Sequence, residues 1–408
     1  MPYLFVGSGQ AGSSIVDEVF AHNNMEKIAT PLVFNSTIRD LKNLSNVERE
    51  SWYGVAESAG LVPGTTDGFE EQVTGGFGRN PVRADEVMDN NREVLDETLR
   101  YHLSNTTVDE EETASDAGSN VPFAFLCCGL GGGTGCGITP HIADAITDYT
   151  DGTCEIIALC VLPNTQGPVG QADEQETSPS RQAWNARYGL DRIEDAVDGI
   201  ILVDNQQLSY HEAAEGQFTD LNEYVAASLV DLVSGTVLEQ IDRSDYDVDP
   251  PIIDIQDIVT SLSFGVGEES TTTGYASLGR SVEMTKSLSG YLFPFVGKKE
   301  IDATVLSHVA GMKQTLTDVD TKEARKAIGL LRSPSRYVAD TSYQINTSKL
   351  RSFLTSRCDE VNLGATLTEQ NLVSFTTLFT YRREDLRRLN ELESLAKEYE
   401  QESEAVVT

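Results

Sequence analysis

The feature that most constrains this chain is a glycine-rich segment, Gly-Leu-Gly-Gly-Gly-Thr-Gly-Cys-Gly, from Gly129 to Gly137. It directly follows the apolar run 121–128 and directly precedes a helix-like stretch, 138–149. Six glycines in nine positions allow backbone N–H groups to converge on an anion at a helix N-terminus. An ordinary turn needs only one or two glycines. The segment therefore predicts a phosphate-binding loop for a nucleotide, and a tight turn without a ligand is the alternative.

A second glycine loop, Gly7–Gly12, follows the apolar residues 3–6 and opens a helix. By itself it matches the G-x-G-x-x-G fingerprint of dinucleotide-binding proteins, which expects an acidic residue at the end of the next strand to hold a ribose hydroxyl. Here that strand, 31–34, is followed by Asn-Ser-Thr at 35–37. Neutral hydrogen-bonding side chains suit a mononucleotide better. A Walker loop is excluded, because neither glycine loop carries the required lysine.

Apolar segments alternate with helical stretches through the first half of the chain. This order predicts an α/β fold with a parallel sheet that helices cover on both faces. Ligands bind at the carboxyl ends of the strands in such sheets, where both glycine loops lie. The expected strands are 3–6, 31–34, 121–128, 155–162 and 199–204.

The periodicity of apolar residues indicates one long helix, 218–243, between two domains. We expect a nucleotide domain over 1–216, a central helix over 217–243, a smaller α/β domain over 244–400 and a short tail over 401–408. In the smaller domain we expect strands near 273–278 and 372–381, and helices near 321–332 and 383–399. We expect a long loop over 54–78 and an acidic loop over 104–120.

Taken together and in this order, the two loops resemble those of the tubulin/FtsZ superfamily of self-assembling GTPases, and in particular its CetZ members. Segment 35–37 resembles the second loop of the superfamily, and segment 76–81 resembles the third. The signature loop, 131–135, is the most specific match. The resemblance covers about the first 260 residues. It implies nucleotide contacts for Gly9, Gln10, Ala11, Gly12, Asn35, Gly78, Asn80, Gly131, Gly132, Gly133, Thr134 and Gly135, with Gln10 also near a phosphate-bound Mg²⁺.

The same resemblance implies residues for the nucleoside. Asn205 and Asn222 would read guanine, because an amide offers both a donor and an acceptor. Phe218 would stack on the base. Glu176 and Arg181 would contact the ribose. The alternatives are a surface position for Asn222 and Gln10, a core position for Phe218, and solvated charges for Glu176 and Arg181.

The resemblance implies that hydrolysis is completed by a second subunit. The corresponding segment contains Asp254 and Asp257, which lie on one face if a helix begins there and together orient a water molecule. A helix cap followed by a second dipole-favoured acid is the alternative. FtsZ carries an asparagine where this chain has Ile252, which puts the rate of hydrolysis in doubt more than nucleotide binding.

Composition indicates the environment. The chain has 65 acidic and 30 basic residues and a formal net charge of −35, yet 39% of it is hydrophobic, which contradicts a disordered acidic protein. Molar salt shortens the Debye length to about 3 Å and mutes such self-repulsion, so we expect a halophilic archaeal cytoplasm. No basic stripe, signal peptide or membrane span is visible, so nucleic acid and membrane insertion are not expected. The six cysteines lack metal-site spacing and mostly fall on expected buried strands.

The sequence predicts a GTP- and GDP-binding GTPase that assembles head to tail into filaments with itself, with other tubulin-like paralogues as further partners. The carboxyl end lacks the long linker and apolar-basic peptide of FtsZ, which favours a CetZ-like protein acting in cell shape or division. One alternative is a GTP-binding regulator of filaments with little hydrolysis. The alternative from another class is a Rossmann oxidoreductase using a flavin or a nicotinamide, which leaves segment 129–137 unexplained.

Overall fold

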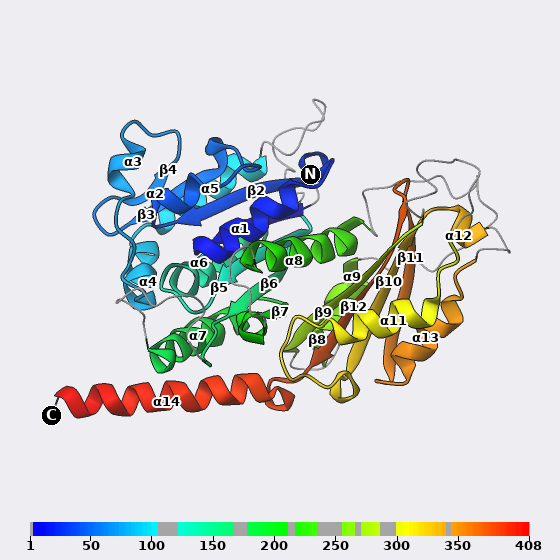
Figure 1. Cartoon of the computed structure of the whole chain (residues 1–408). Coiled ribbons are helices and arrows are strands. Elements are labelled where there is room, and N and C mark those ends of the chain that lie inside the picture. Colours follow the sequence, from blue (N-terminus) through cyan, green and yellow to red (C-terminus); the bar gives the residue numbers. More distant parts are fainter. Residues whose placement is uncertain are drawn as a thin grey trace. The chain divides into compact units, whose positions relative to one another are not determined.

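The computed structural model of the chain describes residues 3–104, 121–166, 178–210, 217–234, 255–265, 271–285, 299–339 and 344–407. The chain divides into two compact units (Figure 1). Met1–Ala226 and Arg387–Thr408 form the first unit, and Ala227–Leu386 forms the second. The expected boundaries near 216, 243 and 400 remain a proposal.

The first unit contains a mostly parallel sheet with the order β7-β6-β5-β1-β2-β3-β4, in which only β4 is antiparallel, to β3. The predicted α/β fold with a parallel sheet is confirmed, and its five expected strands are present. The central strands read as continuous apolar runs because they are buried on both faces. The bounds are β1 Tyr3–Ser8, β2 Ala29–Asn35, β3 Trp52–Ala56, β4 Gly60–Pro63, β5 Phe123–Gly129, β6 Glu155–Leu162 and β7 Gly199–Asp204.

Strands β1 and β5 are neighbours, but the chain leaves them in opposite directions across the sheet: β1 leads to β2, and β5 leads to β6. Right-handed crossovers then place the connecting helices α1 and α6 on opposite faces, and a crevice opens beyond the carboxyl ends of β1 and β5. The helices of this unit are α1 Gly9–Phe20, α2 Ile38–Leu41, α3 Phe69–Gln72, α4 Pro81–Asp89, α5 Arg92–Ser104, α6 Thr134–Tyr149, α7 Pro179–Glu194 and α14 Arg387–Val407, with 3₁₀ turns at Met25–Lys27, Arg49–Ser51 and Asn205–Tyr210.

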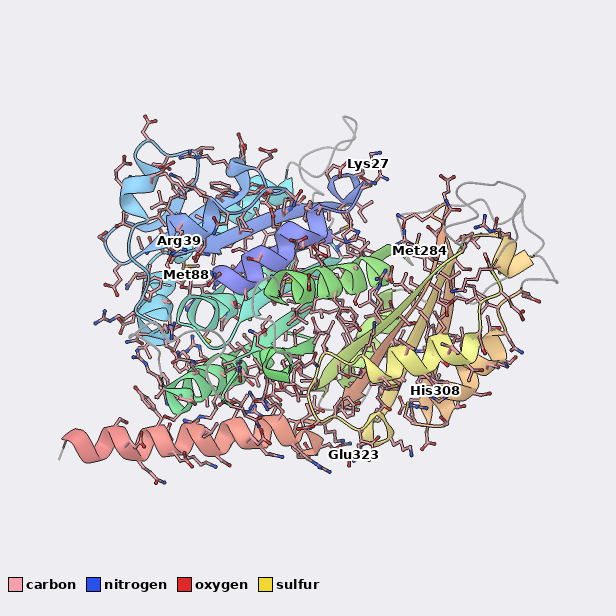
Figure 2. All side chains as sticks on the ribbon, in the orientation of Figure 1. Lys27, Arg39, Met88, Met284, His308 and Glu323 are labelled. Atoms are coloured by element: carbon pink, nitrogen blue, oxygen red, sulfur yellow. The ribbon has the colours of Figure 1, made fainter. Side chains whose placement is uncertain are left out.

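Apolar packing holds the helices on this sheet. The rings of Phe5 and Phe125 stack at 4.9 Å between centroids, on the adjacent strands β1 and β5. Met88 of α4, labelled in Figure 2, is fully buried.

All six cysteines are buried, and burial raises the pKa of Cys154 to about 12, so these thiols act as small apolar groups.

The segment 54–78 was expected to be a long loop, and this is wrong. It contains the end of β3, the strand β4 and the short helix α3. Val55, Leu61 and Val62 are buried by the β3–β4 hairpin, whose turn places Gly60 at a φ of +70°. The pairs of apolar residues are too short to register as strands in the sequence, although the glycine marks the turn between them.

The second unit contains the sheet order β11-β10-β12-β9, with β8 on β9. The expected strand 273–278 is confirmed within a longer β9, and 372–381 coincides with β12. The strands are β8 Ser263–Phe264, β9 Thr272–Met284, β10 Lys326–Ser333, β11 Glu360–Leu367 and β12 Leu372–Tyr381, and the helices are α9 Ile255–Leu262, α11 Ala303–Met312, α12 Arg336–Ala339 and α13 Thr347–Thr355, with 3₁₀ turns at Thr321–Glu323 and Arg383–Asp385.

The helix expected near 321–332 is wrong. A 3₁₀ turn comes first, and then β10 lies between β11 and β12. Every residue of β10 is buried, so its apolar residues do not alternate with polar ones as they would in a half-exposed strand. The spacing of Ala327, Ile328, Leu330 and Leu331 then imitates that of a helix face.

The expected central helix is present as α8, Gln217–Ser234, and residues 235–254 lie outside the described part of the chain. Its first half belongs to the first unit and its second half to the second unit. The helix expected at 383–399 is α14, which begins at Arg387 and packs on α7 of the first unit. No helix within the described ranges has the length and apolarity that crossing a bilayer requires.

Candidate functional site

A pocket of about 710 Å³ lies beyond the carboxyl ends of the central strands in the first unit. Its volume falls in the range of about 300–1,000 Å³ that is usual for small-molecule sites. The lining residues come from the loops that follow β1, β2, β5, β6 and β7, together with segment 76–79 and the first turn of α7. They are Ser8, Gly9, Gln10, Ala11, Asn35, Ser36, Thr37, Asp40, Gly76, Phe77, Gly78, Arg79, Gly129, Gly131, Gly132, Gly133, Thr134, Gly135, Val161, Pro163, Asn164, Pro179, Gln182 and Asn205.

The two glycine loops meet in this pocket. A Cβ atom on Gly9 would lie only 3.2 Å from the backbone nitrogen of Gly135, and Gly9 has a φ of +68°. Both facts favour glycine at this position, because any other residue would be strained and crowded there. The hydroxyls of Ser36 and Thr134 are 2.8 Å apart, which joins the loop after β2 to the start of α6. The backbone therefore approaches closely at the switch point between β1 and β5.

The loop at 76–80 closes one side of the pocket. Gly78 and Arg79 both have a left-handed φ, of +55° and +57°. A Cβ atom on Gly133 would lie 2.7 Å from the backbone nitrogen of Asn80, so this loop touches the signature loop. Asn185 of α7, which is fully buried, donates to the carbonyl oxygens of Arg79 and of Gly131, at 3.0 and 3.3 Å. One side chain thus fixes the spacing of the two loops.

Helices α1 and α6 begin at the pocket without a side chain that caps their first N–H groups. Two other long helices of this unit are capped: Asn80 accepts from the backbone of α4, and Ser178 accepts from that of α7. The four-residue helices α2 and α3 lack a capping side chain as well. The first N–H groups of a helix carry partial positive charge and need an acceptor. The uncapped N-termini of the long helices α1 and α6 therefore make this pocket a favourable site for an anion such as a phosphate chain.

Among the lining residues, only Asp40 and Arg79 are charged. Backbone N–H groups rather than a lysine must therefore supply most of the attraction for an anion. Burial raises the pKa of the Asp40 carboxyl above its usual value, and the nearby Asn35 amide and Arg39 guanidinium oppose that shift. Arg39 is labelled in Figure 2. Asp40 therefore brings a carboxylate to the lining of the pocket.

The loops after β6 and β7 bring two amides to the pocket, Asn164 and Asn205. The side-chain oxygen of Asn164 accepts from the backbone of Gln166 at 3.0 Å. Its side-chain nitrogen is buried and has no hydrogen-bond partner among the described residues. A buried donor without a partner is costly, so this amide group suits a polar ligand. Asn164 was not among the predicted contacts, although its position directly after a strand was a usable signal.

A polar cluster joins the helices α4, α6 and α7 of the first unit. Asp85 of α4 accepts from Tyr188 and Arg192 of α7, at 2.7 and 2.5 Å, and lies 2.6 Å from the Nε2 atom of His141 on α6. Burial, followed by the Asp85 contact, raises the pKa of Tyr188 to about 12. The cluster fixes α4, α6 and α7 to one another. Its members are far apart in the sequence, so no local pattern indicated it.

Most predicted contacts are together in the pocket, and some are not. Gly12 lies outside the lining, where it packs α1 against the backbone of β5, and Asn80 caps α4. Arg181 donates to the carbonyl oxygen of Gly78 at 3.1 Å, and Asn222 lies half-buried on α8. The pocket is lined by the other predicted positions that the structure describes with side chains: Gly9, Gln10, Ala11, Asn35, Gly78, Gly131, Gly132, Gly133, Thr134, Gly135 and Asn205.

Three predicted residues fall where the structure does not describe the side chain. Glu176 and Asp254 lie outside the described residues, and only the backbone of Phe218 is described, in α8. Asp257 lies in the first turn of α9, in the second unit. No group of three or more metal-binding side chains gathers anywhere in the described ranges.

Comparison with known proteins gives matches of sequence and of fold. The model of the tubulin/FtsZ family GTPase domain matches residues 104–213. The tubulin-like protein CetZ of Pyrococcus abyssi is 27% identical over 250 residues. That match covers 60% of this chain and 57% of the relative, so it spans little more than half of the curated protein.

Two solved structures resemble the whole chain. The GDP-bound monomer of CetZ1 from Haloferax volcanii has a TM-score of 0.69 at 18% identity, covering 98% of this chain and all of the other. The GTPγS-bound protofilament of CetZ2 from Haloferax volcanii has a TM-score of 0.66 at 16% identity, covering 99% and 100%. The glycine loops are assembled at one pocket, and the segment that contains the signature loop, 104–213, matches the GTPase domain of the tubulin/FtsZ family, so the chain resembles this family in that segment and has a tubulin/FtsZ-like fold over its length.

Proposed function

We propose that this protein binds and hydrolyses GTP and assembles head to tail into filaments, in a cytoskeletal role in cell shape or division. The observation that carries nucleotide binding is the pair of uncapped helix N-termini, α1 and α6, at a pocket with a single lining arginine. Phosphates would accept hydrogen bonds from these backbone groups. The related CetZ1 and CetZ2 structures hold GDP and GTPγS, which is consistent with this ligand.

The pocket suggests how the ligand would be oriented. The phosphates would lie on Gly9–Ala11 and Gly131–Gly135, where the glycines of both loops allow the backbone to approach. The amides of Asn164 and Asn205 would face the nucleoside from the loops after β6 and β7. An amide there can pair with the carbonyl and N–H groups on the edge of guanine. We also propose that Phe218 and Asn222 of α8 contribute to the base site, as the family resemblance implies.

A magnesium ion would fit the phosphate end of the pocket. Gln10 and Asp40 line it and offer oxygen atoms, the ligands that Mg²⁺ prefers, and Mg²⁺ is often held by one or two carboxylates, phosphates and water molecules. When bound, the ion would neutralise phosphate charge. The residues of the chain would then hold the nucleotide in place and keep its terminal phosphate accessible to water.

Hydrolysis in this proposal is completed by a neighbouring subunit that presents Asp254 and Asp257. Two carboxylates three residues apart in the sequence can together orient a water molecule for attack if a helix places them on one face. A contact between different surfaces of two identical subunits does not close on itself, so it generates filaments. Ile252, where FtsZ has asparagine, favours a second candidate function, a GTP-binding regulator of filaments that hydrolyses slowly.

Phosphate release should rise more steeply than protein concentration, because the site becomes complete only between subunits. We expect release and right-angle light scattering to rise together when GTP is added in molar potassium chloride. The double variant Asp254→Ala, Asp257→Ala should bind GTP normally and release phosphate at least about a hundredfold more slowly, since positioned acid–base groups contribute about 10²–10⁴-fold.

The matched control is Glu398→Ala, Glu402→Ala, which removes the same charge from exposed positions of α14. It should assemble and turn over as the wild type does. Turnover that stays strictly proportional to concentration, or that survives loss of both aspartates, would contradict catalysis at the interface. Nucleotide binding without turnover or scattering would support the regulator.

A further inference from the structure

Arg388, at the start of α14, is buried and reaches two loops of the nucleotide pocket. Its Nε atom donates to the Asp204 carboxylate at 3.1 Å. Its two terminal nitrogens donate to the carbonyl oxygen of Pro163 at 2.6 Å and to the hydroxyl of Thr165 at 2.9 Å. The side chains of Arg388 and Asp204 are 4% and 0% exposed, so water does not screen the pair. The guanidinium fork therefore fixes the loop after β6 relative to the end of β7.

The residues that Arg388 holds flank the two pocket amides. Pro163 and Thr165 lie on either side of Asn164, and Asp204 immediately precedes Asn205. The Asp204 carboxylate also accepts from the backbone of Gln206 at 3.0 Å, which fixes the turn that carries Asn205. Neither amide contacts Arg388 directly in any hydrogen bond that the described residues make. Arg388 can thus determine where both amides point without touching the ligand.

The rest of α14 is attached to a second wall of the pocket. Arg187 of α7 pairs with Glu393 at 3.6 Å and with Glu400, and the Trp184 ring lies 5.9 Å from that of Tyr399. Helix α7 begins at Pro179, which lines the pocket. Helix α14 therefore holds the pocket at two places, through Arg388 and through α7.

We propose that Arg388 is a positioning residue for the nucleoside end of the pocket, and that docking of α14 and binding of nucleotide strengthen each other. This inference rests on the proposed function, because it assigns the nucleoside to the end that Asn164 and Asn205 line. Coupling of two equilibria is reciprocal: if α14 orders the amides, then a ligand on the amides stabilises α14. Helix α14 would therefore be more firmly docked when the pocket holds a nucleotide than when it is empty.

The test compares Arg388→Lys with Arg387→Lys, an exposed neighbour on the same turn. A lysine keeps the charge but lacks the planar fork that spans three acceptors. Titration calorimetry in molar potassium chloride measures the Kd for GTP, dGTP and ATP. We expect Arg388→Lys to weaken GTP binding about tenfold, as loss of roughly one well-placed hydrogen bond would, and to reduce the preference for GTP over ATP and dGTP. Arg387→Lys should match the wild type.

A merely structural role would lower stability without altering base selectivity, so unchanged selectivity in a folded Arg388→Lys protein overturns the proposal. Hydrogen exchange on the wild type provides a second test that does not depend on the variant folding. GDP should slow exchange in the first turns of α14, 387–396, as well as in the loops at 163–166 and 204–206. No slowing in α14, with slowing in the loops, also overturns it. A wild type without affinity for any guanine nucleotide would instead refute the proposed function.

Discussion

Gly132→Ala is expected to fold as the wild type does and to bind GTP about a hundredfold more weakly. Gly132 lines the pocket, and a Cβ atom built on it meets no protein atom within 4 Å. The added methyl group therefore costs the folded protein little and occupies space into which the phosphate chain must come. Loss of about two charge-assisted hydrogen bonds, at roughly 1.5 kcal/mol each, gives about 3 kcal/mol, which is a factor of about a hundred in Kd.

Gly75→Ala is the matched control. Its Cβ atom also meets nothing within 4 Å, but Gly75 does not line the pocket. Calorimetry of GTP binding and urea unfolding should be run on both variants. We expect the two proteins to unfold at the same urea concentration and only Gly132→Ala to lose affinity. Equal affinity in both would mean that the phosphates lie elsewhere than on the signature loop.

Asp231→Ala is expected to destabilise the second unit by about 3–5 kcal/mol. Asp231 of α8 is 1% exposed and accepts from Arg280 at 2.7 Å, Arg332 at 3.2 Å and Thr376 at 2.9 Å. Removing it leaves two largely buried guanidinium groups without their shared partner. The free-energy cost of these unpaired buried charges exceeds the net stabilisation that the intact ion pairs contribute. Urea unfolding measures the loss. The control is the pair of Arg325 and Asp385 in the same unit, whose side chains are 55% and 23% exposed, and Asp385→Asn should cost less than about 1 kcal/mol.

The direction of the pH dependence follows from the same contacts. Burial alone would raise the pKa of Asp231, but Arg280 and then Arg332 outweigh it, so the pKa lies below its usual value. The stabilisation of the folded protein by the ionised Asp231 is therefore complete above the pKa that this carboxyl has in the unfolded chain, near 3.9. It is lost as the pH falls through the lower pKa that Asp231 has in the folded protein. Replacing all three charged residues with apolar ones should restore much of the stability. A loss below 1 kcal/mol for Asp231→Ala would contradict this account of the cluster.

The parallel sheet and the phosphate end of the pocket were predictable because they depend on local pattern. Buried parallel strands are continuous apolar runs, and glycine-rich loops between a strand and a helix have few uses other than anion binding. The continuous apolar runs predicted β1, β5, β6 and β7, and the glycine-rich segments predicted the loops that meet at Gly9 and Gly135. The same rule about buried strands explains the main error, since β10 has no alternation and was interpreted as a helix.

The residues that hold the site together were not predictable, because each acts over a long sequence separation. Asn185 bridges the loops at Arg79 and Gly131, and Arg388 reaches Asp204 from the carboxyl-terminal helix. A lone asparagine or arginine in a helix has no distinctive spacing. Their functions become visible only when the fold places them beside backbone carbonyls and a buried carboxylate.

Identification of the nucleotide that copurifies with the wild type tests the central claim most directly. The protein is purified in molar potassium chloride and a sample is denatured. The nucleotide that this sample releases should be GDP or GTP, near one equivalent per chain by mass spectrometry. Folded protein freed of its nucleotide should rebind GTP in preference to ATP. A flavin or a nicotinamide in the pocket, or no affinity for guanine nucleotides under these conditions, would contradict the account.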